Sequence, residues 1–475
     1  MTSTPLPPPD DTSAVPATPF DTLALPPAVL ANLARLGYHA MTPIQAASLP
    51  VALAGDDLIA QARTGSGKTV AFALPLLQRL DARRFAVQAL VLCPTRELAE
   101  QVSQEIRRLA RAEDNIKVLT LCGGSPIRPQ IDSLAHGAHV VVGTPGRLLD
   151  HLARGSLQLD ALATLVLDEA DRMLDMGFFD DISQVVEACP PTRQTLLFSA
   201  TYPDGVVRLA RRFMRQPREI AVAGLHADDK IRQRFYRVDA GQRLAAVGLL
   251  LRHYRPESAL AFCNTRQQCR DLVDALAAEG IEALALHGEL DQRERDQVMV
   301  QFANRSCTVL VATDVAARGL DVAGLEAVIN VDPTPDPEVH VHRIGRTGRA
   351  DRDGWALTLV GPNDERRVDA IAAAMGFVPQ WASVAELQAE AQMPLCAPMV
   401  TLQILGGRKD KIRPGDVLGA LTGEAGFAAG QIGKINVNEQ STYVAVERGI
   451  ARQALKRLAD GRIKGKKVRV RLLGD

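Results

Sequence analysis

The chain has 475 residues, 47% of them hydrophobic and 23% charged, which is ordinary for a globular protein and excludes a disordered chain, a collagen and a coiled-coil rod. The formal charge is zero, but residues 396–475 hold 15 Lys and Arg against seven Asp and Glu, a net of +8, and the first 395 residues carry −8. A basic end on an acidic body indicates a polyanionic partner bound mainly at that end; the alternative is a solvated basic face without a ligand.

The cysteines and the apolar segments indicate the compartment. The seven cysteines form no Cys-x-x-Cys pair and no metal-binding cluster, which favours free thiols in a reducing environment. The N-terminus lacks the basic and apolar regions of a signal peptide, and no apolar run is long enough to cross a bilayer. We therefore expect a soluble cytoplasmic protein with no membrane partner.

The predicted elements begin after a proline-rich start. Residues 1–19 hold six prolines with Ser, Thr and Asp, so we expect a disordered tail. From residue 20 to residue 220, short apolar runs alternate with longer helical patterns, which is typical of an α/β domain with a buried parallel sheet. These runs are 89–93, 139–143, 164–167 and 194–198.

The same alternation returns after an irregular stretch at 221–230, which we interpret as a linker. Residues 231–384 therefore predict a second α/β domain of similar size, and residues 385–395 a second linker. The strands predicted in this second domain are 258–263, 309–312 and 326–331.

Residues 396–475 follow a different pattern. One helix is predicted to start at Pro414, and a second has an apolar face that runs from Ile450 to Leu458. The predicted strands are 400–405, 432–437, 442–447 and 467–472. The order βαββαβ is that of an RNA-recognition-motif (RRM) fold.

A glycine-rich segment follows the apolar run at 58–60 and opens a helical pattern. Backbone N–H groups in such a turn, at a helix N-terminus, cradle phosphate oxygens. Lys68 adds a positive charge for the β- and γ-phosphates, and the Thr69 hydroxyl can bind Mg²⁺. We predict a nucleotide-phosphate site made of Ala62, Arg63, Thr64, Gly65, Ser66, Gly67, Lys68 and Thr69, with Ala62 in place of the first glycine of the usual pattern.

The acidic segment Asp168-Glu-Ala-Asp171 comes directly after the predicted strand 164–167. A carboxylate at that end of a parallel sheet faces the phosphates, so we predict that Asp168 holds Mg²⁺. We predict that Glu169 polarises the attacking water. The alternative, an acidic helix start, does not explain the position after a strand.

From Phe20 to about Val384 the chain resembles the DEAD-box RNA helicases, because their motifs occur in order. They lie at 37–45, 62–69, 94–99, 123–124, 144–147, 168–171, 199–201, 261–265, 292–295, 313–321 and 342–349. The resemblance implies an α/β fold with two RecA-like parallel-sheet domains in tandem, followed here by a C-terminal α+β RRM-like domain. It also implies ATP and Mg²⁺ as cofactors.

The resemblance gives further residues a role at the nucleotide. The Gln45 amide can both donate to and accept from adenine, an arrangement that rejects guanine. Phe20 is implied to stack on the base, with a loose apolar contact as the alternative, and Asp321 to bind the ribose.

Other implied residues connect hydrolysis to domain closure. Arg346 and Arg349 are implied arginine fingers, which reach the γ-phosphate only when the second domain closes on the first. His342 is implied to contact the 168–171 loop. Ser199, Thr201 and Asp171 are implied to couple the two halves, with a strand-end turn as the alternative.

The core residues that the resemblance implies bind RNA are not of a kind that recognises bases. Small residues and glycine at helix starts suit contact with phosphates and 2′-hydroxyls, so the helicase core is expected to be indifferent to sequence. The implied residues are Thr95, Arg96, Gly124, Thr144, Arg147 and Thr313.

The third domain is expected to supply the specificity. Only Tyr443 keeps an aromatic residue of the usual RRM pattern, so base stacking on its sheet is not favoured. The segments 411–426 and 431–435 resemble the DbpA subfamily, which implies binding to a large-subunit ribosomal RNA hairpin and to pre-ribosomal particles, in large-subunit assembly. The basic residues predicted to bind RNA are Lys411, Arg413, Lys434, Lys464, Lys466, Lys467, Arg469 and Arg471.

Three alternatives stay open from the sequence. One is a general DEAD-box helicase of RNA turnover or cold response, and another is a non-catalytic ATP-dependent RNA clamp. A DNA helicase is the third, although no DNA partner is expected.

Overall fold

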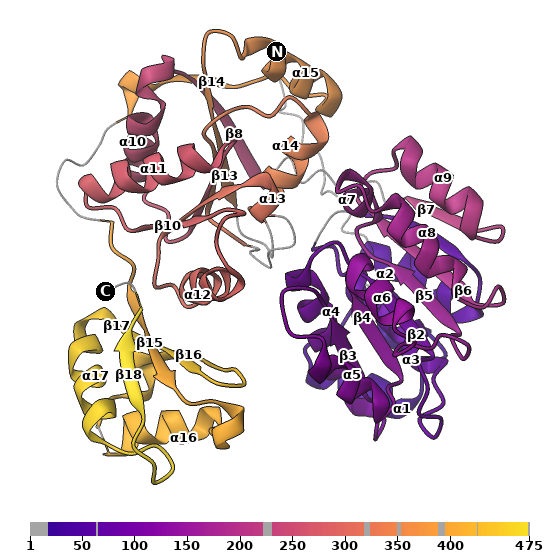
Figure 1. Ribbon diagram of the computed structural model, residues 1–475. Helices are drawn as coiled ribbons and strands as arrows, with labels where there is room; N and C mark the ends of the chain where they lie inside the picture. The colour runs from indigo at the N-terminus through magenta and orange to yellow at the C-terminus, as the bar shows by residue number, and fades with distance from the viewer. Residues whose placement is uncertain are drawn as a thin grey trace, which may run out of the picture. The chain divides into compact units, whose positions relative to one another are not determined.

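The computed structural model describes residues 18–62, 65–221, 230–317, 324–348, 353–387, 395–424 and 426–473 (Figure 1). The chain divides into two compact units, residues 1–224 and 225–475, which we describe separately. Four residues with a predicted role, Arg63, Thr64, Asp321 and Arg349, lie outside the described residues, as does most of the predicted tail.

The first unit is built on a seven-stranded sheet in the order β3-β4-β2-β5-β6-β1-β7, and every pairing in it is parallel. Its strands are β1 Leu58–Gln61, β2 Ala89–Leu92, β3 Val118–Leu121, β4 Val140–Gly143, β5 Thr164–Leu167, β6 Gln194–Ser199 and β7 Arg218–Ala221. Its α-helices are α1 Pro27–Arg35, α2 Pro43–Ala54, α3 Lys68–Gln78, α4 Arg96–Leu109, α5 Arg128–Ala135, α6 Pro145–Ala153, α7 Ala170–Asp175, α8 Phe179–Glu187 and α9 Asp204–Phe213.

Alternate residues of these strands enter different hydrophobic clusters. Leu58 and Ala60 belong to one cluster and Ile59 to the other, and Val91 and Leu90 divide in the same way. Because successive side chains point to opposite faces, both faces of the sheet are covered. The prediction of a buried parallel sheet is therefore confirmed, and the continuous apolar runs are explained by burial on two sides.

The second unit begins with another seven-stranded parallel sheet, in the order β10-β11-β9-β12-β13-β8-β14. Its strands are β8 Ile231–Arg237, β9 Ala259–Cys263, β10 Ala283–Leu286, β11 Val309–Thr313, β12 Ala327–Asn330, β13 Gly354–Val360 and β14 Trp381–Ser383. Its α-helices are α10 Arg243–Tyr254, α11 Arg266–Ala278, α12 Gln292–Ala303, α13 Asp314–Ala317, α14 Pro337–Ile344 and α15 Glu365–Met375.

The C-terminal domain has an antiparallel sheet in the order β16-β17-β15-β18. Its elements are β15 Met399–Leu405, α16 Pro414–Gly419, the π-helix η7 Ala420–Glu424, β16 Ile432–Val437, β17 Thr442–Glu447, α17 Ala451–Asp460 and β18 Arg469–Leu472. The predicted βαββαβ order is confirmed. The last strand starts two residues later than predicted, because its partner β15 ends at Leu405, which pairs with Arg469. Residues 463–466 before it form a tight turn closed by hydrogen bonds between Ile463 and Lys466.

The C-terminal domain is hydrogen-bonded to the rest of its unit. The hydroxyl of Thr401, at the start of the sheet, contacts the Ser306 hydroxyl at 2.7 Å and accepts from the Asn304 amide at 3.2 Å. Arg448 pairs with Glu282 at 2.5 Å. Thr401 is fully buried by these contacts.

Two further sequence-based expectations concern cysteines and apolar helices. All seven cysteines are free thiols, and six of them are buried. Within the described residues, no helix is both long and apolar enough to span a bilayer.

Candidate nucleotide site and RNA surfaces

The glycine-rich segment lies where the sequence predicts, between β1 and α3. Gly67 is the N-terminal cap of α3 with a φ of 89°, and Lys68 is its first residue. Lys68 is 6% exposed, and its Nζ has no hydrogen-bond partner among the described residues. A buried ammonium without an acceptor is costly, so this position fits a phosphate group.

The predicted adenine-reading residue is tied to this segment. Gln45 accepts a hydrogen bond from the Thr42 N–H at 2.9 Å and donates one to the Gly67 carbonyl at 3.0 Å. The Thr42 hydroxyl donates to the Ser66 carbonyl at 2.8 Å. Both the oxygen and the nitrogen of the Gln45 side-chain amide are therefore hydrogen-bonded within the protein. To recognise adenine, the amide would have to exchange Thr42 and Gly67 for the base. Phe20, predicted to stack on the base, is 4% exposed in the core of this unit.

Asp168 and Glu169 follow β5 at the same edge of the sheet. Asp168 is 3% exposed, and its Oδ1 has no hydrogen-bond partner among the described residues. Burial raises the pKa of the Asp168 carboxyl, the Lys68 ammonium opposes the shift, and the Glu169 carboxylate adds to it. A divalent cation would stabilise the charged form of Asp168, so the site fits the predicted Mg²⁺ ligand.

A buried arginine, which the sequence reasoning missed, contacts the predicted catalytic glutamate. Glu169 occupies the N-cap position of α7 with a left-handed φ of 53°, and its Oε2 lies 3.1 Å from Arg172 Nη1, with both side chains 5% exposed. The spacing of three residues, which brings side chains together on a helix, was the available signal. The ion pair holds the Glu169 carboxylate in place at the end of β5.

Asp171 joins the acidic motif to residues 199–201 at the end of β6. One Asp171 oxygen accepts from the N–H groups of Ala200 and Thr201, at 3.1 and 2.9 Å, and from the Thr201 hydroxyl at 2.9 Å. The Asp171 N–H donates to the Ser199 hydroxyl at 3.3 Å. One buried carboxylate therefore joins the acidic motif directly to residues 199–201.

The residues predicted to bind nucleotide and those predicted to bind RNA lie on different halves of one edge of the first sheet. The phosphate segment, the acidic motif and residues 199–201 follow β1, β5 and β6, which are neighbours. Thr95, Gly124 and Thr144 follow β2, β3 and β4, which form the other side. Ligands of parallel sheets bind at the carboxyl ends of the strands, so both sets of predicted residues lie at the edge where ligands are expected.

The residues predicted to bind RNA on this edge lie at helix N-termini and beside a loop that is held by hydrogen bonds. Thr95 caps α4 by accepting from the Leu98 N–H, and Thr144 is the cap position of α6. Arg147 donates twice to the Ser125 carbonyl, at 3.1 Å each, beside Gly124 with its φ of 74°. Arg96 NH1 is buried without a hydrogen-bond partner among the described residues.

The second unit places its predicted residues around a buried arginine. Arg343 binds both carboxylate oxygens of Asp314 at 2.7 Å and the Asp332 carbonyl at 2.9 Å. It thereby fixes α14, which carries His342, against the end of β11, where Thr313 is the last residue. Sequence reasoning gave Arg343 no role, and the implied finger Arg346 is 4% exposed.

The face of the third sheet that carries Tyr443 is largely buried, and among the described residues of the C-terminal domain it presents no exposed aromatic ring. Tyr443 is 4% exposed, and its hydroxyl accepts from the Gln403 amide at 3.1 Å. Arg471 donates to the other end of that amide at 2.6 Å. The side chain of Arg471, predicted to bind RNA, is thus engaged within the sheet.

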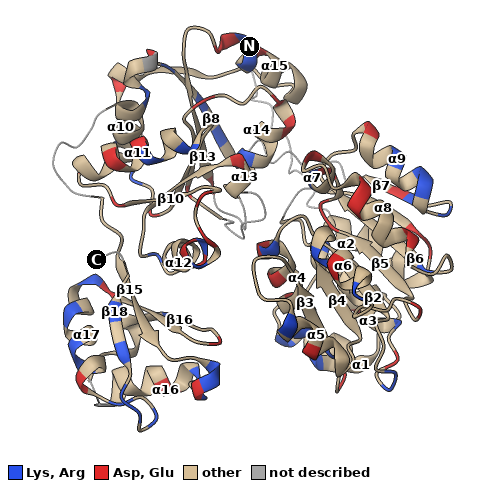
Figure 2. Cartoon of the chain, in the orientation of Figure 1, with Lys and Arg blue, Asp and Glu red and all other residues tan. Residues whose placement is uncertain are grey.

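Five of the other basic residues predicted to bind RNA lie on loops of the C-terminal domain, and Figure 2 shows Lys and Arg also on α17 and β18. Lys464 donates to the Lys411 carbonyl at 2.9 Å and lies 3.9 Å from Asp416, so the loop that precedes α16 meets the loop that precedes β18. Lys411 and Lys464 both have left-handed φ values, 62° and 52°. We call the group that these loops expose the basic corner: Lys411, Arg413, Lys464, Lys466 and Lys467. Lys434 is exposed on β16, and Arg469 on β18.

Family models match all three domains. The DEAD/DEAH box helicase model matches residues 42–209, the helicase conserved C-terminal domain model residues 242–351, and the DbpA RNA binding domain model residues 401–472. The ATP-dependent RNA helicase DbpA of Escherichia coli (strain K12) is 53% identical over 96% of this chain and 100% of its own length. The chain belongs to the DEAD-box helicases of the DbpA type.

Other relatives share the helicase part. The ATP-dependent RNA helicase CshA of Listeria monocytogenes is 45% identical over 73% of this chain and 67% of its own. The structure of S. cerevisiae Dbp5 bound to RNA and ADP BeF3 is 30% identical and covers 78% of this chain and 96% of its own, with a TM-score of 0.71. This DbpA-type chain is an RNA-dependent ATPase and helicase with an added RNA-binding domain.

Proposed function

We propose that Lys68 holds the β- and γ-phosphates of ATP and that Glu169 orients the attacking water. The observation that carries this is the buried Lys68 ammonium and Asp168 carboxylate oxygen, both lacking hydrogen-bond partners among the described residues at one sheet edge. Asp168 and Thr69 would hold Mg²⁺, which neutralises phosphate charge when bound. Arg346 and Arg349 complete the site when the helicase domains close, with His342 against the acidic motif and Asp321 on the ribose.

Two substitutions test these roles. Glu169→Gln keeps the shape of the side chain but lacks the basicity to orient water, so ATP should still bind while turnover is lost. Lys68→Ala should weaken nucleotide binding itself. Titration with a fluorescent ATP analogue and steady-state hydrolysis with RNA measure the two effects. Turnover near that of the unaltered protein in Glu169→Gln would remove Glu169 from this role.

We infer that the C-terminal domain directs the helicase to a hairpin of large-subunit ribosomal RNA, in large-subunit assembly in the cytoplasm. Support comes from the net charge of +8 in residues 396–475 and from the basic corner. The core residues proposed to bind RNA lie at helix starts and suit contact with phosphates, which carries no sequence information, so we infer that targeting comes from the C-terminal domain.

Competition binding tests the targeting. The full-length protein should prefer the ribosomal hairpin over a scrambled hairpin of the same length, at one salt concentration. A chain ending at residue 395 should lose that preference, because the remaining core contacts backbone. If the shortened chain keeps the preference, the C-terminal domain does not target the enzyme.

A further inference from the structure

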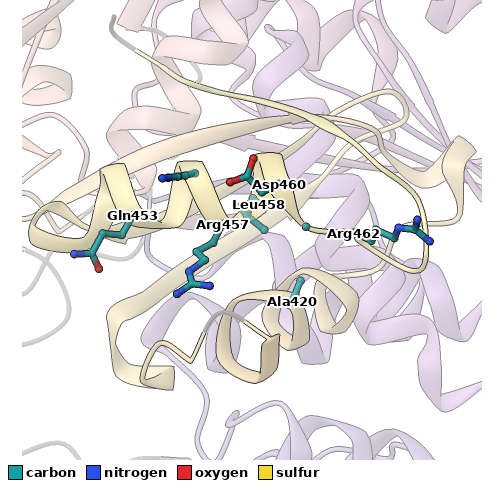
Figure 3. Close-up of a pocket in the computed structure, with 8 residues that line it drawn as sticks. Ala420, Gln453, Arg457, Leu458, Asp460 and Arg462 are labelled. Carbon is teal, nitrogen blue, oxygen red and sulfur yellow. The ribbon is translucent and has the colours of Figure 1, made fainter.

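The parts of the chain that are proposed to meet RNA are built in two ways. The C-terminal domain presents cations, and Figure 3 shows two of them, Arg457 and Arg462, beside a groove of about 670 Å³ along α17. The first unit presents the exposed backbone of Gly124 and the N-termini of α4 and α6 instead. A long cationic side chain adjusts to a phosphate, whereas a backbone group binds well only where the chain is already held in place. What holds the loop around Gly124 is therefore part of how the first unit binds RNA.

The loop from Cys122 to Ser125 carries two glycines and is open on one side. Gly124 is exposed, with a left-handed φ of 74°. A Cβ atom on Gly123 would meet no atom within 4 Å, so packing does not require glycine there. A glycine leaves the backbone accessible to a ligand that approaches closely, which fits a loop that contacts the sugar-phosphate backbone of RNA.

Two side chains hold this loop from its other side. Arg147 of α6 donates twice to the Ser125 carbonyl, at 3.1 Å each. Gln130 of α5 donates from its amide nitrogen to the Cys122 carbonyl at 3.1 Å and to the Ser125 hydroxyl at 2.9 Å. One amide thus ties together both ends of the loop, with the two glycines between them.

A buried histidine fixes that amide. His151 is fully buried on α6, one turn beyond Arg147, and its Nε2 lies 3.1 Å from the Gln130 oxygen. Because the Gln130 nitrogen donates to the loop, the Gln130 oxygen accepts from the Nε2–H of His151. Burial lowers the pKa of the His151 imidazole, and the Arg147 charge lowers it further, so the ring is uncharged at neutral pH. Its Nδ1 lies 2.9 Å from the hydroxyl of Ser156, beyond the end of α6.

We propose that His151 is a positioning residue for RNA binding. It orients the Gln130 amide, which holds the loop 122–125 so that Gly124 meets the sugar-phosphate backbone of RNA beside the N-terminus of α6. A loop held in its binding conformation binds more tightly because less freedom is lost on binding. The inference rests on the proposed RNA role of Gly124 and Arg147, and it deepens that role by naming the residues that hold the loop in place.

Two amide replacements of the histidine distinguish its two ring nitrogens. The nitrogen of a Gln side chain is as many bonds from Cβ as Nε2 of His, and that of Asn as many as Nδ1. His151→Gln should therefore keep a donor for Gln130, whereas His151→Asn should lose it and keep a partner for Ser156. His136→Asn is the control, because His136 is exposed at the end of α5 and contacts the Asp132 carbonyl of that helix.

The measurement isolates the contribution of the helicase core in the full-length protein. Affinity is measured for the ribosomal hairpin alone and for the same hairpin with a single-stranded extension, with a non-hydrolysable ATP analogue present. The ratio of the two affinities is the gain from the core. His151→Asn should reduce this gain about fivefold or more, and His151→Gln and His136→Asn about twofold or less. In RNA-stimulated hydrolysis, His151→Asn should raise the KM for RNA and leave kcat within about twofold, as loss of ground-state binding does.

The outcomes separate this inference from the RNA residues on which it rests. An equal gain in His151→Asn and in the unaltered protein overturns the inference, and so does an equal loss in His151→Gln and His151→Asn. If the extension gives the unaltered protein no gain, the proposed RNA residues of the core are wrong and the inference is wrong with them.

A second position covers the case in which His151→Asn lowers the thermal stability of the first unit. Gln130 is only half-buried, and Gln130→Met removes both of its bonds to the loop. Gln130→Met should reduce the gain as much as His151→Asn, and adding His151→Asn to it should reduce the gain no further, because both act through one amide. An unchanged gain in Gln130→Met overturns the inference.

Discussion

The buried pair of Glu169 and Arg172 leads to a prediction that can be stated in free energy. Arg172→Gln leaves the Glu169 carboxylate without its cation in a site where both side chains are 5% exposed and 3.1 Å apart. Two charges at that distance attract each other by about 5 kcal/mol at an effective dielectric constant of about 20. Removing one partner of such a buried pair costs about 3–5 kcal/mol. The same change should lower ATP turnover, because the carboxylate loses its fixed position.

Amide hydrogen exchange over residues 164–175 measures the local stability, and hydrolysis with RNA measures turnover. Arg154→Gln is the control, because Arg154 pairs with Asp150 at 2.9 Å with both side chains largely exposed, and such pairs contribute about 0–1 kcal/mol. Arg172→Lys should restore part of both losses. In a protein that already carries Glu169→Gln, adding Arg172→Gln should lower the local stability much less, because position 169 then has no carboxylate that would lose its cation. The reasoning is refuted if Arg172→Gln behaves like Arg154→Gln in both measurements.

Three further predictions concern the other motifs. Gln45→Ala should weaken ATP binding and reduce discrimination against GTP, measured by competition between the two nucleotides; unchanged selectivity in the variant would contradict the adenine role. Thr201→Val removes one hydrogen bond to a buried carboxylate, worth about 1.5–3 kcal/mol, so duplex unwinding per ATP hydrolysed should fall; an unchanged ratio would place the coupling elsewhere. Arg349→Lys should lower turnover by on the order of a thousandfold, because a point charge does not replace a planar guanidinium; an active variant would move the finger role to another residue.

The sequence by itself determined the order of the elements and the position of each motif on them. The strand predicted at 164–167 is observed as Thr164–Leu167, and two strands of the third domain, Ile432–Val437 and Thr442–Glu447, also have the predicted bounds. Such local patterns are readable because burial on one or two faces imposes a fixed period on apolar residues. The glycines after β1 and Lys68 at the start of α3 also indicated, from the sequence alone, a segment that binds phosphate.

Only the tertiary structure decided which distant residues contact one another. Thr42 and Gln45 could be read as a capping box from their spacing, but the bond from Gln45 to Gly67 joins elements 22 residues apart. The bonds from Thr201 to Asp171 depend on β5 and β6 being neighbours in the sheet. A single sequence contains the local period of each element but not the pairing between elements, because many pairings satisfy the same apolar pattern and the packing of the whole core selects one.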